Sequence, residues 1–404
     1  MTNKKLRWAN IAISTTLLLM VSAHPLQAKP NQPAESKVRI DLFVGSNALL
    51  SVPDTKKQIR ANQDSEAKSA DQYRHAQKAE VAQINPDIFQ PAALRVGSEL
   101  VLSAFGREIS IEITQASNEI NEVRSITGQL TGSEAGQAFL SVTDEQFFGY
   151  LEMPSRGQEL EIIPTADDGR YLVKDIDIEN KKVLEGVHPE SVQPLDERAA
   201  VFDQFGLGGQ RHSESQAIMK TPSMKKTAPA SLDVLVVYTA NAAKSLERIG
   251  WDIDAVISQA FQRANTTLRN SEINGRFELV DSRGVDYLED GDCGQMLRQL
   301  QEAENGLQRA QELRDETQAD IVSLFVHPMT DAGGCGGLLR YHPEDYPIGY
   351  SSSVDEFRAK TYGANVIRAL QAFDTYTFVH ELGHNLGAHH HADQINPTGD
   401  SSFS

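Results

Sequence analysis

Short runs of apolar residues, several of them alternating with polar residues, occupy the stretch between about residues 90 and 180. The runs lie at residues 100–102, 109–113, 138–142 and 159–163. Turn-forming sequences at residues 131–133 and 167–169 stand between them. A period of two, bounded by turn formers, is typical of antiparallel strands. The pattern therefore predicts a small β-rich domain with its core at about residues 90–180.

Polar segments lie on both sides of this predicted domain. Residues 29–90 are rich in Gln, Lys, Ala and Glu, and we expect them to form a lead-in or a loose helix. Residues 205–230 combine glycines, serines, prolines and lysines without an apolar period that could be buried. Such a composition predicts an exposed linker that proteases reach easily. Whether it is only a linker or also a processing site stays open.

The hydrophobic pattern changes after residue 230. Largely apolar runs predict strands at residues 232–239, 276–287 and 321–326. Apolar residues at helical spacing predict helices at residues 253–269 and 295–316. Strands that alternate with helices favour a mixed or mainly parallel sheet with helices packed on it. The sequence therefore predicts an α/β (α+β) domain with a mixed twisted sheet at residues 231–404.

The first 28 residues follow the order of a secretory signal peptide. Basic residues form a positively charged start, an apolar stretch covers residues 11–21, and Ala28 ends the segment with a small side chain. We expect cleavage after Ala28, with Ala23 as a second possible point. The apolar stretch falls short of the roughly 20 residues that span a bilayer, so a membrane anchor is the weaker interpretation. The predicted location is secreted or periplasmic, without membrane contact after cleavage.

Composition and charge exclude one class of partner. Hydrophobic residues make up 40% and charged residues 23% of the 404-residue chain, which is ordinary for a soluble globular protein. The formal net charge is −18, and no basic stripe interleaved with aromatic residues reverses that balance. A phosphate backbone would be repelled by such a surface, so we expect no nucleic acid partner.

The chain contains only two cysteines, Cys293 and Cys335. In an exported protein such a pair predicts one disulfide, and two free thiols are the alternative. The disulfide would connect the start of the helix predicted at residues 295–316 to the glycine-rich loop at residues 333–337. A cysteine zinc site is not expected, because two isolated cysteines lack the CxxC spacing of such sites.

The sequence HELGHNLGAHH at residues 380–390 concentrates the side chains that can bind a metal. Residues four apart on a helix lie about 40° apart in projection, so His380 and His384 face one ion from the same side. Glu381 lies on that side of the helix as well. The apolar residues cluster on the opposite side and can anchor the helix on the sheet. They are Phe378, Val379, Leu382 and Leu386.

A hydrolytic zinc site keeps three protein ligands and one position for water. Gly387 can adopt the left-handed backbone that ends a helix and turns the chain, which brings His390 to the third ligand position. Glu381 would then be the general base that takes a proton from the attacking water. A fortuitous HExxHxxGxxH pattern would occur in roughly one such chain in ten thousand. We therefore predict one catalytic Zn²⁺ ion held by His380, His384 and His390.

The neighbours of these residues offer weaker alternatives. His389 and His391 flank His390, but the spacing selects His390, and we expect the other two side chains to be solvated. No Glu follows Glu381, so Asp393 and Asp400 are the only downstream carboxylates that could replace His390 as the third ligand.

The motif HExxHxxGxxH resembles the extended motif of the metzincin clan of zinc endopeptidases. The strand predicted at residues 232–239, the helix after it and the Gly-Cys-Gly loop before the motif are similar to the bacterial reprolysin-like enzymes, including the peptidyl-Asp metalloendopeptidases. The resemblance covers residues 231–404. It implies a metzincin-like catalytic domain there and a β-rich propeptide domain at residues 29–230. It also implies that substrate lies extended along the strand at residues 337–341.

The chain departs from this family in two respects. The clan has a Met-containing turn beneath the zinc, whereas no Met follows Met329 and the sequence stops at Ser404. We therefore expect a catalytic domain that is C-terminally incomplete. The propeptides of some relatives silence the zinc with a cysteine, but residues 29–230 contain no Cys. Latency would need a carboxylate, His212 or occlusion of the cleft instead.

Taken together, these features predict a secreted zinc-dependent metalloendopeptidase, made as a precursor, that hydrolyses peptide bonds. Its partners would be protein or peptide substrates and its own propeptide. The alternative is a catalytically inactive zinc-binding fragment or scaffold protein, which the missing Met-turn favours. A pure adhesion module has only the strand pattern of the β-rich half in its support.

The sequence says little about cleavage preference. The peptidyl-Asp resemblance implies acidic residues after the scissile bond, which would need a cationic pocket. Arg340, Arg358 and Arg368 are candidates because they precede the motif, although arginines at such positions are usually solvated surface charges. The natural substrate, the processing point, the oligomeric state and any structural Ca²⁺ ion stay undetermined.

Overall fold

The computed structural model describes residues 38–50, 76–118, 122–132, 135–165, 169–178, 229–338, 360–373 and 375–388. Several predictions fall outside these residues. They concern the signal peptide at residues 1–28, the predicted linker at residues 205–230 up to residue 228, His212, Arg340, Arg358, His389, His390, His391, Asp393 and Asp400. Among the described residues, no helix combines the length and the apolar character that crossing a membrane would require.

The strands and helices follow in this order. The strands of the first half are β1 (Arg39–Asp41), β2 (Phe43–Leu50), β3 (Ala76–Ile84), β4 (Glu99–Ala104), β5 (Arg107–Asn118), β6 (Arg124–Thr131), β7 (Gln137–Val142), β8 (Phe147–Met153), β9 (Gln158–Pro164) and β10 (Arg170–Asp177). The strands of the second half are β11 (Ala230–Thr239), β12 (Gly275–Val285), β13 (Ile321–Val326), β14 (Gly334–Gly336) and β15 (Ala364–Arg368). The α-helices are α4 (Ala240–Arg248), α5 (Ile253–Asn270), α6 (Cys293–Glu302), α7 (Gln308–Thr317), α9 (Ala369–Ala372) and α10 (Thr377–Asn385).

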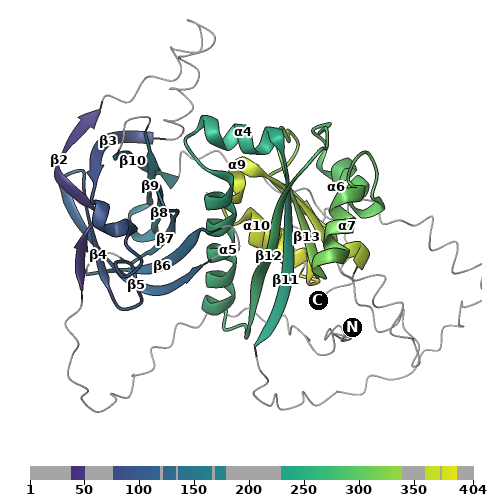
Figure 1. Ribbon diagram of the computed structural model, residues 1–404, viewed down its shortest axis with the longest axis horizontal. Helices are drawn as coiled ribbons and strands as arrows, with labels where there is room; N and C mark the ends of the chain where they lie inside the picture. The colour runs from purple at the N-terminus through teal and green to yellow at the C-terminus, as the bar shows by residue number, and fades with distance from the viewer. Residues whose placement is uncertain are drawn as a thin grey trace, which may run out of the picture. The chain divides into compact units, whose positions relative to one another are not determined.

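Strands β1 to β10 form a ten-stranded sheet in the order β1-β4-β5-β6-β7-β8-β9-β10-β3-β2 (Figure 1). We refer to this sheet and its loops, from Val38 to Ile178, as the β-rich region. Its neighbouring strands are antiparallel, except that β1 runs parallel to β4. The sheet curls until β2 meets β4, where the Asn47 amide donates a hydrogen bond to the Ser103 carbonyl at 2.6 Å. One face of the curled sheet encloses a core that includes Leu42, Leu140 and Ile162.

The predicted lead-in or loose helix at residues 29–90 is wrong for the described part of that segment. Strands β1, β2 and β3 lie there, so the sheet begins at Arg39 rather than at about residue 90. Strand β3 pairs with β10 on one side and with β2 on the other. Its sequence, AQKAEVAQI, contains few of the β-branched and aromatic residues that favour strands. Pairing with distant strands, which satisfies its backbone donors and acceptors, therefore outweighs its weak local preference.

The second half forms a five-stranded mixed sheet in the order β12-β11-β13-β15-β14, as the alternation of strands and helices predicted (Figure 1). The first four strands are parallel, and β14 is antiparallel to β15 at the edge. Helices α6 and α7 pack their apolar residues against one face of this sheet. On the other face, Phe378 of α10 packs against Phe261 of α5 and Phe325 of β13, with ring centres 5.2 and 5.7 Å apart.

The long helix predicted at residues 295–316 is instead two helices, α6 and α7. The chain between them takes left-handed backbone angles, with φ +58° at Ala303 and φ +96° at Gly306. A Cβ atom at Gly306 would lie 2.5 Å from the Asp286 carbonyl oxygen, so the close approach of this turn to the end of β12 requires glycine. The predicted disulfide between Cys293 and Cys335 is confirmed, and it joins the start of α6 to β14.

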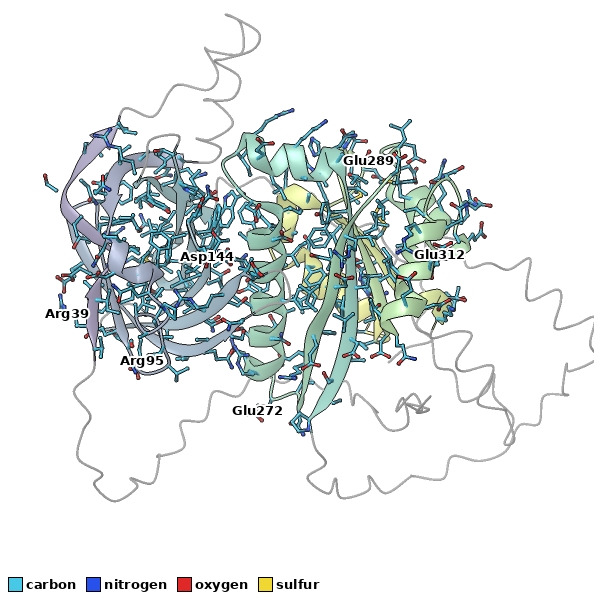
Figure 2. The ribbon with its side chains drawn as sticks, viewed as in Figure 1. Arg39, Arg95, Asp144, Glu272, Glu289 and Glu312 are labelled. Carbon is cyan, nitrogen blue, oxygen red and sulfur yellow. A yellow bond between two sulfur atoms is a disulfide. The ribbon has the colours of Figure 1, made fainter. Side chains whose placement is uncertain are left out.

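Charged side chains of both halves lie at the surface, as in soluble globular proteins. Arg39, Arg95 and Asp144 of the β-rich region are exposed, as are Glu272 and Glu312 of the second half (Figure 2). Glu289, also labelled in Figure 2, is half-buried and accepts a hydrogen bond from the Asn241 amide at 2.9 Å. The buried charges described below are therefore exceptions to the general distribution of charge.

Candidate metal and catalytic site

Helix α10 carries the HExxH sequence and ends as predicted. Phe378 and Leu382 are buried on the side that faces the sheet, whereas Val379 and Leu386 are half-buried. Gly387 has φ +90°, the left-handed conformation expected at a helix end. The Ala388 amide donates to the Gly383 carbonyl at 2.9 Å, which closes the last turn. The chain thus leaves the helix in a sharp turn directly before His390, which lies outside the described residues.

His380 and His384 bring their imidazoles together on one side of α10. Their Nε2 atoms are 3.0 Å apart, and their ring planes are inclined by 84°. The His384 Nδ1 atom lies 2.6 Å from the Ala388 carbonyl oxygen, which can only accept, so Nδ1 carries the proton. The lone pair of His384 is therefore on Nε2, the atom that faces His380. A carbonyl that orients the second nitrogen in this way is typical of a metal-binding histidine.

The spacing of the two imidazoles fits a zinc ion. Two nitrogen ligands at tetrahedral angles, each at the usual zinc–nitrogen distance, would be separated by roughly 3.3 Å. The observed 3.0 Å needs only a small movement to reach that value. Among the described residues, no three His, Cys, Asp or Glu side chains gather at one point. The structure therefore brings together two of the three predicted ligands.

Glu381 is fully buried beside these histidines. Neither carboxylate oxygen has a hydrogen-bond partner in the described part of the chain. Burial raises the pKa of this carboxyl from its ordinary value to about 8. Leaving a buried carboxyl without a partner is costly, and a nearby cation with its bound water would relieve that cost. The environment of Glu381 thus fits a metal ion as well.

Two glycines of strand β14 let the backbone pass directly over Glu381. A Cβ atom at Gly334 would lie 2.9 Å from both Cγ and Oε1 of Glu381. A Cβ atom at Gly336 would lie 2.9 Å from the Glu381 carbonyl oxygen and 3.2 Å from its Oε2. All of these distances are shorter than ordinary van der Waals contacts, so a side chain larger than that of glycine would clash at both positions. The glycine-rich loop predicted from the sequence is therefore part of the wall around Glu381.

The strand beside the site begins earlier than predicted. The sequence interpretation placed the substrate-binding edge at residues 337–341, whereas the edge strand of the structure is Gly334–Gly336. Gly337 and Leu338 follow it without strand geometry, and residues 339–341 lie outside the described residues. The shift arises because Gly334, Cys335 and Gly336 pair with Ile367, Val366 and Asn365 of β15. The disulfide at Cys335 attaches the same segment to α6.

Asn385, the last residue of α10, is a site residue that the sequence analysis missed. Its Nδ2 atom lies 3.0 Å from the Gly337 carbonyl oxygen, 2.8 Å from that of Tyr362 and 2.8 Å from that of Ala364. Its Oδ1 atom accepts a hydrogen bond from Asn365 at 2.7 Å. Asn385 therefore fixes the end of α10, next to His384, to the end of β14 and the start of β15. No local signal reveals this role, because the carbonyls come from other segments.

Arg368, the only one of the three predicted cationic candidates among the described residues, lies at the end of β15. Its backbone amide donates to the Gly333 carbonyl at 2.9 Å, and its Nη1 atom donates to Gln371 at 3.3 Å. It is thus next to the glycine-rich loop and half-buried. Arg340 and Arg358 lie outside the described residues.

Comparisons with known proteins agree with this chemistry. Residues 228–404 match the model Reprolysin_5, described as metallo-peptidase family M12. The peptidyl-Asp metalloendopeptidase of Pseudomonas aeruginosa is 29% identical over 192 residues, a match that covers 45% of this chain and 28% of that protein. The chain thus spans little more than a quarter of the length of this relative.

Two solved structures are similar at low sequence identity. Metalloproteinase-II from Bacteroides fragilis is 13% identical with a TM-score of 0.39, and the match covers 73% of this chain and 81% of that one. A chaperone–substrate complex is also 13% identical with a TM-score of 0.31, and covers 74% of this chain and 33% of that one. Residues 228–404 are therefore similar to the metallopeptidases of family M12, and the Pseudomonas relative is named as an endopeptidase.

Proposed function

We propose that this chain is a secreted zinc-dependent endopeptidase that is made as a precursor. Residues 1–28 would direct export to the periplasm or the outside of the cell, residues 29–230 would form the propeptide, and residues 231–404 the catalytic domain. His380, His384 and His390 would hold the zinc ion, and Glu381 would be the general base. Its substrates would be proteins or peptides.

The single observation that carries this proposal is the convergence of His380 and His384 beside a buried, unpartnered Glu381. The two Nε2 atoms lie 3.0 Å apart, and the Ala388 carbonyl orients the His384 ring so that its lone pair is available. Glu381 has no competing partner among the described residues. Such an arrangement is expensive for a protein unless a metal ion and a water molecule complete it.

The roles proposed for the zinc ion and for Glu381 follow from the positions of the two histidines and of the Glu381 carboxyl. A zinc ion held by these histidines would supply Lewis acidity, making a water molecule more acidic and polarising the scissile carbonyl. Glu381 takes the proton from this water as the water oxygen forms its bond to the carbonyl carbon. The same carboxyl then gives the proton to the amide nitrogen as the carbon–nitrogen bond breaks. Because Glu381 is fully buried, bulk water has no access to the proton between the two transfers.

An extended peptide would bind along the free edge of β14. This strand is the last of the five-stranded sheet in the described residues and pairs only with β15. A peptide added antiparallel to it would gain backbone hydrogen bonds and pass the side of α10 that carries Glu381. The name of the Pseudomonas relative suggests that the preferred peptides contain Asp near the scissile bond.

The experiment that tests the proposal measures hydrolysis of a labelled, unstructured protein by the purified chain. It is done before and after cleavage between the β-rich region and residue 231, with a zinc chelator and after zinc is restored. We expect cleavage that the chelator stops and zinc restores. Replacing Glu381 by Ala should reduce the rate by roughly 10²- to 10⁴-fold while bound zinc stays near one ion per chain.

Two results would contradict the proposal. One is a Glu381→Ala variant that digests the substrate as fast as the parent. The other is a folded, zinc-loaded chain that shows no turnover after cleavage, which would favour the inactive zinc-binding alternative. A Glu312→Ala variant is the matched control, because Glu312 is an exposed glutamate of α7.

A further inference from the structure

Strand β8 of the β-rich region is buried at every one of its positions. Alternate residues of a strand point to opposite faces, so one face of a curled sheet is enough to build its core. Phe147, Leu151 and Met153 belong to that core. Phe148, Tyr150 and Glu152 point to the other face and are nevertheless buried. Residues of the second half cover them, within the compact unit Val38–Ser404.

Glu152 lies at the centre of this contact. Its Oε1 atom accepts a hydrogen bond from Arg263 Nε of α5 at 2.9 Å, and its Oε2 atom accepts one from the Tyr376 hydroxyl at 2.7 Å. Arg263 is 1% exposed. Its guanidinium carbon lies 4.4 Å from the ring centre of Tyr150 and 4.8 Å from that of Phe139. The charge of Arg263 is thus surrounded by groups of the β-rich region.

Glu161 of β9 forms a second buried ionic contact. Lys174 of β10 lies 2.6 Å from Glu161 Oε2, and both side chains are almost fully buried. The indole nitrogen of Trp251, two residues before α5, donates to the other oxygen of Glu161. The Trp251 ring stacks on Phe148 with centres 5.3 Å apart and contacts Phe373 at 4.4 Å. An aromatic cluster therefore lies between the two ionic contacts.

Polar contacts continue along one side of α5. The Ser141 hydroxyl donates to the Ala255 carbonyl at 3.2 Å. The Gln259 side chain donates to the Phe148 carbonyl at 3.4 Å, and Gln262 donates to the Leu140 carbonyl at 3.0 Å. Residues 255, 259, 262 and 263 share one face of the helix. This face of α5 therefore exchanges hydrogen bonds with β7 and β8 of the β-rich region.

We propose that the β-rich region is a lasting non-covalent partner of the second half, docked on α5, and that Glu152 holds the start of the HExxH helix through Tyr376. The docking of the β-rich region on α5 is independent of the proposed function, whereas the positioning of the HExxH helix rests on it. Breaking a buried ion pair leaves an uncompensated charge, so separating the two parts would leave the charge of Arg263 without its Glu152 partner. Tyrosine, tryptophan and arginine anchors in buried pockets are also the residues that dominate the affinity of interfaces.

The path from Glu152 to the site is short. Tyr376 directly precedes α10, and His380 lies one helical turn further on. The His380 amide donates to the Tyr376 carbonyl at 2.9 Å, so the position of Tyr376 is transmitted to the first turn of the helix. Partial desolvation of its hydroxyl and the nearby Glu152 raise the pKa of Tyr376, so the hydroxyl stays protonated as a donor. Tyr376 and Glu152 are positioning residues in this proposal, because neither touches the reacting groups.

The docking part is tested on the full chain with a protease recognition sequence inserted between Gly208 and Gly209. After complete cutting, the sample is run on a size-exclusion column at micromolar concentration and at high salt. We expect the two pieces to elute together, since buried pairs are screened little by salt. Separate elution of two folded pieces would overturn the proposal. This readout does not depend on peptidase activity, so it distinguishes failure of the docking from failure of the proposed function.

Substitution of Glu152 tests whether its ion pair with Arg263 contributes to the association of the two pieces. Glu152→Gln should weaken the association by at least about tenfold, because the charge that compensates Arg263 is lost. Glu108→Gln is the matched control, since Glu108 pairs with Arg39 at 3.1 Å on the exposed surface. We expect the control to elute as the parent does. An equal effect of both variants would overturn the role of Glu152.

The positioning part is tested with Tyr376→Phe, which keeps the ring and removes only the hydroxyl, so the fold should persist. We expect the two pieces to stay together, while kcat for the unstructured substrate falls by about tenfold and KM changes little. An unchanged kcat in a variant that remains docked would overturn the positioning role and leave the docking surface in place.

Discussion

Two regions of the described part of the chain each contain buried glutamates whose surroundings are opposite. Where the β-rich region meets α5, Glu152 lies 2.9 Å from Arg263 and Glu161 lies 2.6 Å from Lys174. On α10, Glu381 is equally buried, but neither of its oxygens has a hydrogen-bond partner among the described residues. The first two carboxylates are thus compensated by the protein itself, and the third is not.

The difference fits a structural role for Glu152 and Glu161 and the catalytic role proposed for Glu381. A compensated pair is neutral as a unit and helps to define which surfaces meet. An uncompensated carboxyl has a perturbed pKa and a site open to an external cation or proton, which is the usual condition of a catalytic group. Glycines at positions 334 and 336, which let β14 approach Glu381 closely, show that the wall around it is tightly packed.

The largest expected effect comes from removing one of the converging imidazoles. In a His384→Ala variant, two of the three proposed ligands remain, and we expect both bound zinc and hydrolysis to fall to background. Zinc content after dialysis and hydrolysis of a labelled protein measure the two losses. His389→Ala is the matched control, because the spacing of the motif leaves His389 out of the ligand set. Zinc retained at the level of the parent in His384→Ala would contradict the assignment.

Removing the lysine that pairs with buried Glu161 should destabilise the folded protein. Lys174→Met leaves Glu161 buried without its partner, and we expect the free energy of unfolding to fall by about 3 to 5 kcal/mol. Urea unfolding followed by Trp251 fluorescence reports the change, because the Trp251 indole is bonded to the same Glu161. Lys78→Met on the neighbouring strand β3 is the control, since Lys78 is exposed. Similar losses in both variants would mean that Glu161 needs no partner.

The uncompensated region should respond to pH. Burial raises the pKa of Glu381 from 4.5 to about 8, so between these values the native state of the metal-free protein holds a proton that the unfolded state has released. The free energy of unfolding of the metal-free protein therefore falls as pH rises through this window. Denaturant midpoints at about pH 5 and about pH 8 measure the slope. We expect Glu381→Gln to flatten it, and an unchanged slope in this variant would refute the contribution of Glu381.

A smaller effect is expected from a methyl group beside Glu381. In Gly334→Ala the new Cβ atom meets Glu381 within 2.9 Å and displaces the carboxyl, so we expect kcat to fall about tenfold with little change in zinc content. Gly284→Ala on β12 is the control, because its Cβ atom would make only an ordinary contact, 3.7 Å from Tyr238. Equal activity of the two variants would show that the close approach of β14 is not needed.

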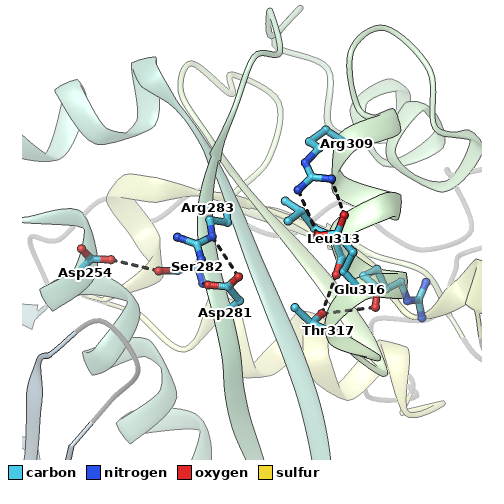
Figure 3. A network of polar contacts seen from close by, with 9 residues as sticks. Asp254, Asp281, Ser282, Arg283, Arg309, Leu313, Glu316 and Thr317 are labelled. Atoms are coloured by element: carbon cyan, nitrogen blue, oxygen red, sulfur yellow. Dashed lines mark hydrogen bonds and ion pairs between the residues drawn. The ribbon is translucent and has the colours of Figure 1, made fainter. Parts of the chain in front are cut away.

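The smallest effect is expected for ion pairs in contact with solvent. Arg309 forms two hydrogen bonds to Glu316, at 2.8 and 3.2 Å, and Arg283 pairs with Asp281 at 3.0 Å (Figure 3). Because water screens the exposed Arg309–Glu316 pair, Arg309→Gln should leave the denaturant midpoint unchanged within error. A shift as large as that of Lys174→Met would remove the distinction between buried and exposed pairs on which the comparison rests.

Much of the second half was predictable from local patterns. The predicted strands at residues 232–239 and 321–326 and the predicted helix at residues 253–269 agree with β11, β13 and α5. The left-handed Gly387 and the disulfide between Cys293 and Cys335 are also confirmed. The assignment of His390 as a ligand, and the division into propeptide and catalytic domain, stay predictions. The alternation at residues 109–113 and 159–163 likewise marks parts of β5 and β9 correctly.

Other features had no local signature. Strand β8 is buried on both faces and shows no alternation, and β3 is a strand only through its two neighbours. The break between α6 and α7 depends on the approach of Gly306 to the end of β12. In each case the deciding contact involves residues far apart in the chain, which a pattern confined to one segment cannot report.

Distance along the chain also decides which residues of the candidate site could be predicted from the sequence. His380, Glu381 and His384 share one turn of one helix, so their spacing alone brings them to a common side, and the sequence sufficed to find them. Glu152 and Arg263 are 111 positions apart, and Asn385 meets the Gly337 carbonyl across 48 positions. Helical periodicity relates only near neighbours, whereas packing of separate segments sets which distant charges and carbonyls meet. Only the folded chain could therefore reveal that Glu152 of the β-rich region contacts Tyr376 before the HExxH helix and that the end of this helix contacts Gly337.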